Sequence, residues 1–80
     1  MQPVAIEVIF DESYFTVRLN NGSSLRVPFE WFPKLQAATP DQRQDVRISA
    51  SGYGLHWDKL DEDISVAGLL KGHRSLARDL

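Results

Sequence analysis

The stretch from residue 14 to residue 28 constrains the fold most, because two patterned segments flank a turn. Apolar and polar residues alternate over 14–19, which predicts a β-strand with one face on a core and the other toward water. Asn20-Asn21-Gly22 follows, and these residue types tolerate the positive φ of a type I′ turn. Residues 24–28 predict a returning strand. The stretch therefore predicts a β-hairpin.

Further strands are expected on both sides of this hairpin. Residues 4–10 predict a strand in which one alternating set of side chains is Ile6, Val8 and Phe10. Together with the hairpin it forms an antiparallel meander. Residues 46–50 and 55–57 predict a fourth and a fifth strand, joined by a glycine-flanked turn.

Three short helices are expected between and after these strands. The apolar spacing changes to three over 29–38, where Pro33 is tolerable only in the first helical turn. In Thr39-Pro40-Asp41-Gln42, Thr39 suits the N-cap and Gln42 completes a capping box. Ser65 is placed to cap a last short helix that ends before Gly72.

These elements predict an α+β fold with the order β-β-β-α-α-β-β-α, in which short helices cover one face of a small antiparallel sheet. We assign residues 1–72 to a single domain and residues 73–80 to a C-terminal tail with weak patterning. A chain of 80 residues supports one thin core. Such a core is compatible with self-association.

The composition limits the cellular compartment and the classes of partner that we expect. The sequence contains no cysteine, which excludes disulfides and thiolate metal sites and suits a reducing compartment. It shows neither a secretory N-terminal pattern nor an apolar run long enough to span a bilayer, so we expect a soluble cytoplasmic protein. The net charge of −2 argues against a domain that binds nucleic acid by neutralising phosphates. Residues 58–63 carry −3 of charge and set this sign.

The segment 52–65 contains most of the side chains that could take part in binding or catalysis. Within it, we expect residues 58–63 to form a polar loop. The candidate interaction residues there combine aromatic rings with acids, types that anchor and orient protein interfaces. They are Tyr53, His56, Trp57, Asp58, Asp61, Glu62 and Asp63, joined from outside the segment by Trp31. Two alternatives remain for single residues. Trp57 suits the core better than an interface, and His56 is expected to be a surface histidine pointing away from its neighbours.

Catalytic and metal sites are less well supported. His56 and the nearby aspartates are ligand types for a divalent cation, yet the spacing of a calcium loop and its glycine are missing. Carboxylates that catalyse hydrolysis need a cleft walled by apolar residues, for which a thin core leaves little room. No nucleophile motif of the G-x-S-x-G kind is present. We therefore predict no enzyme activity, no catalytic residue, no metal and no cofactor.

A different class of function would use the solvent face of the sheet. Tyr14, Arg18, Arg26 and Arg47 could share that face and bind a ligand or single-stranded nucleic acid by stacking and charge. We keep this as the alternative to a protein-binding module.

Four motifs stand out together: the Asn-Gly hairpin, Phe29-Glu30-Trp31-Phe32-Pro33, Ala38-Thr39-Pro40, and the long stretch from Gly52-Tyr53-Gly54-Leu55-His56-Trp57 to Leu60-Asp61-Glu62-Asp63-Ile64-Ser65-Val66. In these motifs the chain resembles an uncharacterised bacterial family, domain of unknown function 2442. The resemblance covers residues 4–72; Asp58 stands where the pattern often has proline. It implies no established activity or cofactor and no assigned catalytic residue. It further implies an antitoxin-like role, in which the protein neutralises or complexes a co-encoded small protein.

Overall fold

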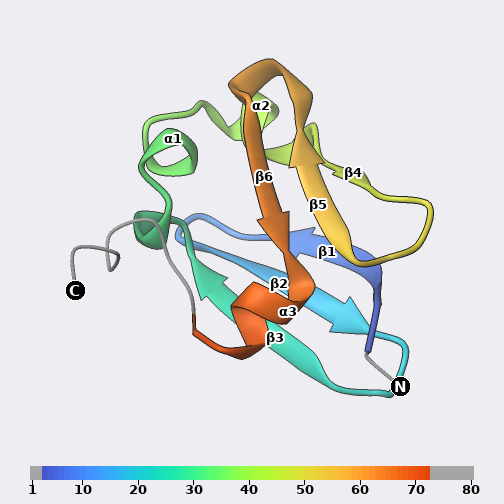
Figure 1. The fold of residues 1–80 in the computed structure, drawn as a ribbon. Helices are drawn as coiled ribbons and strands as arrows, with labels where there is room; N and C mark the ends of the chain where they lie inside the picture. Colours follow the sequence, from blue (N-terminus) through green and yellow to red (C-terminus); the bar gives the residue numbers. More distant parts are fainter. Residues whose placement is uncertain (1–2, 73–80) are drawn as a thin grey trace.

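Two three-stranded antiparallel sheets form the framework of the protein in a computed structural model that describes residues 3–72 (Figure 1). The first sheet has the order β1 (Ala5–Phe10), β2 (Tyr14–Leu19), β3 (Ser24–Pro28). The second has the order β4 (Arg47–Ile48), β5 (Gly54–Trp57), β6 (Glu62–Ser65). The short helical segments are η1 (Phe29–Trp31), α1 (Pro33–Gln36), α2 (Pro40–Gln44), η2 (Asp58–Leu60) and α3 (Val66–Leu70).

The α+β class and the antiparallel pairing are confirmed, with two differences in detail. The strands form two sheets instead of one, and the second sheet lies across the first in Figure 1. The segment 58–63, expected to be a loop, holds η2 and the start of a sixth strand. The predicted tail, residues 73–80, lies outside the described residues.

The core lies between the inward faces of the two sheets and the short helices. Phe15 is fully buried at its centre, with its ring centroid 5.4 Å from that of Phe29 and 5.6 Å from that of Trp57. Burying a side chain of this size contributes roughly 1.5–3 kcal/mol. The buried apolar residues are Ala5, Phe15, Val17, Leu19, Val27, Phe29, Phe32, Leu35, Leu55, Trp57, Ile64, Val66 and Leu69.

A β-bulge changes the expected alternation in β1. Ala5 pairs with Leu19 and Glu7 pairs with Arg18, so Ile6 is an extra residue in the ladder. After this extra residue, the side chains of β1 point to the opposite face from the one that simple alternation starting at Ala5 would give. Ile6 is 55% exposed instead of sharing the face of Val8, and Ala5 is buried.

The turn between β2 and β3 is of a different type from the one predicted. The Gly22 N–H donates to the Leu19 carbonyl at 3.2 Å, and the Leu19 N–H donates to the Ser23 carbonyl at 2.9 Å. Gly22 has a φ of +90°, whereas Asn20 and Asn21 do not have the positive φ values that a type I′ turn requires. The loop therefore has three residues with glycine in the left-handed position, and the predicted hairpin itself is confirmed.

The predicted helix caps are confirmed. The Gln42 N–H donates to Thr39 Oγ1 at 3.2 Å, and the Gln42 side chain accepts the Thr39 N–H at 2.9 Å, so the capping box is complete. The Gly68 N–H donates to Ser65 Oγ at 2.9 Å. These bonds fix where α2 and α3 begin.

Gly52 lies in the turn between β4 and β5 and contacts the start of β1. Its carbonyl accepts the Ala5 N–H at 2.8 Å, and its φ is +81°. A Cβ at this position would lie 2.7 Å from the Val4 Cβ. Only glycine fits this contact without displacing β1.

We expect Gly52→Ala to lower the free energy of unfolding by about 3 kcal/mol, because a left-handed alanine is strained and its methyl overlaps Val4. Gly22→Ala is the matched control: its φ is also positive, but a Cβ there would meet nothing within 4 Å. The control should lose only about 1 kcal/mol. Urea unfolding measures both, and equal losses would contradict the contact with Val4.

Candidate functional site

One row of polar side chains crosses the outward face of the second sheet. His56 on β5 pairs in register with Arg47 on β4 and with Asp63 on β6. Because Leu55 and Trp57 on either side of His56 are buried, the row points away from the core. The predicted direction of His56, opposite to its two neighbours, is therefore confirmed.

His56 is held in place rather than loosely solvated. Its Nδ1 lies 2.7 Å from Asp63 Oδ1, and its side chain is 26% exposed. A Cβ on Gly54 would stand 3.0 Å from His56 Nε2, so the ring lies over that glycine. The missing side chain at position 54 makes room for the imidazole, and Asp63 sets its orientation.

Arg47 and Asp58 form a two-point contact at one end of this row. Arg47 Nε and Nη2 donate to the two Asp58 carboxylate oxygens at 3.1 and 3.0 Å. These hydrogen bonds lower the pKa of Asp58 and raise the pKa of Arg47. Both side chains stay largely exposed, at 60% for Arg47 and 66% for Asp58. The carboxylate is thus fixed and still accessible.

The remaining two acids are Asp61, which connects η2 to β6, and Glu62, which is the first residue of β6. Asp61 adopts a left-handed conformation with φ of 54°, and its carbonyl accepts a hydrogen bond from Lys34 Nζ at 2.7 Å. Burial raises the pKa of the half-buried Glu62, which the nearby Lys34 charge partly offsets. The four acids therefore occupy four different environments instead of one solvated loop.

The aromatic candidates separate into core and surface. Trp57 is 1% exposed, and its Nε1 donates to the Arg43 carbonyl at 2.7 Å. It therefore belongs to the core, which is the alternative the sequence favours, and cannot contact a partner. Trp31 is half-buried and packs against the core, whereas Tyr53 is 49% exposed.

The four residues of the alternative sheet-face site do not share one face. Tyr14, Arg18 and Arg26 lie on the first sheet, whereas Arg47 lies on the second. Arg18 pairs with Glu7 at 3.0 Å and Arg26 pairs with Asp11 at 3.3 Å. A phosphate would have to compete with these carboxylates. The Arg26 guanidinium also covers the Tyr14 ring, 4.1 Å from its centroid, where a base would stack.

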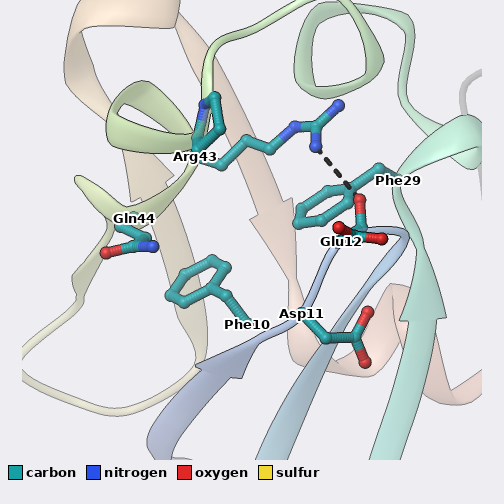
Figure 2. A pocket seen from close by; sticks show the side chains of 7 residues that line it. Phe10, Asp11, Glu12, Phe29, Arg43 and Gln44 are labelled. Carbon is teal, nitrogen blue, oxygen red and sulfur yellow. Dashed lines mark hydrogen bonds between the residues drawn. The ribbon is translucent and has the colours of Figure 1, made fainter.

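Sequence reasoning missed a pocket beside Arg43. A space of about 320 Å³ is bounded by Phe10 and Phe29, by both ends of α2 and by the turn after β1 (Figure 2). The residues that line it are Phe10, Asp11, Glu12, Phe29, Pro40, Arg43 and Gln44. These residues are too dispersed in the sequence to suggest a common site.

Two further observations concern metal ions and membranes. Among residues 3–72 no three His, Asp or Glu side chains are grouped so that they could hold a metal ion. Within the same range, no helix is long and apolar enough to cross a membrane.

Comparisons with known proteins give one family and two similar structures. The family described as "Protein of unknown function (DUF2442)" matches residues 5–75. A crystal structure of a protein of unknown function from Rhodospirillum rubrum is 35% identical, covers 94% of this chain and 93% of its own, and has a TM-score of 0.85. A solution NMR structure of an uncharacterized protein from Chromobacterium violaceum is 30% identical, covers 94% and 71%, and has a TM-score of 0.78. No curated protein matches the sequence.

The environment of Glu62 predicts a pH-dependent variant. The pKa of Glu62 is higher in the folded chain than in the unfolded chain. At pH values between these two pKa values, the folded chain binds a proton that the unfolded chain has released. The free energy of unfolding therefore falls as the pH rises through this interval. Glu62→Gln should therefore raise the free energy of unfolding at pH 7. The gain should vanish below pH about 4, where the carboxyl is protonated in both states. Urea unfolding at several pH values measures this, and a gain that is unchanged at acidic pH would contradict it.

Proposed function

Given that the chain belongs to the DUF2442 family of proteins of unknown function, we propose that it is a non-enzymatic protein-binding module that pairs with a basic partner protein. The observation that carries this proposal is the set of accessible carboxylates fixed on the outward side of the second sheet. Asp58 and Asp63 keep 66% and 74% of their side-chain surface exposed while Arg47 and His56 hold them.

Fixed acids are useful for recognition because binding then costs less conformational entropy. A free aspartate must be ordered when a partner binds, whereas Asp58 and Asp63 already have defined positions. Their charge selects the partner. Residues 58–63 carry −3 of charge, so a surface rich in lysine and arginine is complementary to them.

Tyr53 supplies an aromatic group near the same sheet. It directly precedes β5, its carbonyl accepts the Val66 N–H at 2.9 Å, and half of its side-chain surface is exposed. Tyrosine is among the residue types that contribute most to protein interfaces. The proposed interface therefore consists of Tyr53, His56, Asp58, Asp61 and Asp63, with Glu62 at its edge.

An antitoxin-like role is the specific form of this proposal, and it rests on the family resemblance. In that role the partner is a small protein encoded beside this one, and both act in the cytoplasm of a bacterium. The cysteine-free sequence suits that compartment. The carboxylates that pair with Arg18 and Arg26, and the guanidinium of Arg26 over the Tyr14 ring, make a nucleic-acid-binding role the weaker alternative.

Replacing two of the displayed acids tests the proposed interface. We expect Asp61→Asn with Asp63→Asn to weaken binding of a protein that copurifies from the native cell by about tenfold or more, because two complementary charges are lost. Asparagine is chosen because it tolerates the left-handed conformation of residue 61. Titration calorimetry with the purified pair measures this, and raising the salt should weaken the parent complex.

The matched control is Glu7→Gln with Asp41→Asn, which removes the same charge from exposed positions outside the second sheet. It should leave the affinity within about twofold, since distant surface charges contribute little. Equal losses in the two double variants would exclude a specific acidic interface, and unchanged affinity in the first would remove these acids from it.

A further inference from the structure

Arg43 is a fixed part of the pocket wall rather than a free cation. Its Nε donates to the Leu35 carbonyl at 2.8 Å and its Nη2 to the Gln36 carbonyl at 2.9 Å. Its Nη1 donates to the Glu12 carbonyl at 3.3 Å, the bond dashed in Figure 2. The guanidinium also lies over the Phe29 ring, 4.3 Å from its centroid. Carbonyl oxygens thus engage all three of its nitrogens, and an aromatic ring covers one face.

Two hollows adjoin at this point. The first is the slot of about 320 Å³ walled by Phe10, Phe29 and Pro40. The second, of about 290 Å³, shares Glu12, Phe29 and Arg43 with it and is also lined by Tyr14, Glu30 and Gln36. The Phe10 and Phe29 rings stack on each other, at 6° with centroids 6.4 Å apart, and Phe29 is 1% exposed, so the accessible apolar surface of the slot comes from Phe10 and Pro40. The slot lies at the small end of the range for ligand pockets, which suits one ring-sized apolar group.

Acids outnumber cations around the two hollows. The Arg43 guanidinium lines both and, among residues 3–72, is bound by carbonyl oxygens and not by a carboxylate, so it keeps its positive charge. Two acids, Glu12 and Glu30, stand against this one cation. Asp11 is engaged, since Oδ1 accepts the backbone N–H groups of Ser13 and Tyr14 and Oδ2 accepts Arg26. These contacts lower the pKa of Asp11. Glu12 and Glu30, by contrast, have exposed side chains that form no ion pair with any of residues 3–72. A complementary ligand therefore carries its charge as a cation.

We propose that this slot binds an aromatic side chain of a partner protein that is followed by lysine or arginine. The ring packs on the accessible surfaces of Phe10 and Pro40, and the adjacent cation meets Glu12 and Glu30 in the second hollow. This site is built from other residues than the acidic face of the second sheet, so it goes beyond the proposed function and stands without it.

Short peptides test the ring and the charge separately. The probe is acetyl-Gly-Trp-Lys-Gly-amide, compared with acetyl-Gly-Trp-Glu-Gly-amide and with acetyl-Gly-Gly-Lys-Gly-amide, at low salt. NMR shifts of the Gln44 side-chain amide and the Glu12 and Glu30 backbone amides follow binding. We expect the Trp-Lys peptide to bind roughly fivefold tighter than the Trp-Glu peptide, and the peptide without a ring to cause no shifts.

Two double variants locate the charge effect. Glu12→Gln with Glu30→Gln should abolish the preference for the Trp-Lys peptide, while Asp61→Asn with Asp63→Asn should leave it intact. All four changes are at exposed positions. The proposal is overturned if the Trp-Glu peptide binds as well or better, if no peptide shifts these amides at millimolar concentration, or if the first double variant keeps the preference. Failure of the acidic-face interface would change none of these results.

Discussion

Contact between Phe15 and Trp57 joins the two halves of the protein, and much of the rest depends on it. The first ring comes from β2 and the second from β5, and their centroids lie 5.6 Å apart in an edge-to-face arrangement. Each sheet alone has three short strands and one apolar face, which is marginal for independent stability. Burying those faces against each other gives this small chain a single core. The outward face of the second sheet can then be almost entirely polar.

This arrangement separates the core from the proposed binding surface along the same strand. In β5, Leu55 and Trp57 are buried, whereas His56 between them lies in the surface row with Arg47 and Asp63. Because successive side chains of a strand point to opposite faces, neighbouring residues of β5 lie either in the core or on the surface. Surface substitutions in this row leave the core intact, which makes binding and folding separable in experiment.

The sequence predicted best what depends on local chemistry. The alternation in β2, the Thr39 capping box and the Ser65 cap each require only a few neighbouring residues. Asn-Gly correctly indicated a hairpin, yet it suits both a type I′ turn and a loop with one left-handed glycine. The strand β6 was missed because Ile64 is its one buried residue among charged and polar neighbours, so alternation had too little contrast. The Arg43 pocket joins distant segments through backbone carbonyls, which leave no pattern in side-chain identity.

Residue 43 connects the turn after β1 and α1 to the second sheet through different atoms. Its guanidinium binds the carbonyls of Glu12, Leu35 and Gln36, while its own carbonyl accepts the indole of Trp57. A substitution can remove the first role, but the second belongs to the main chain and survives any change of side chain. Side chains at position 43 can therefore change during evolution, and with them the pocket wall beside Phe29, while the main-chain carbonyl still accepts the hydrogen bond from Trp57.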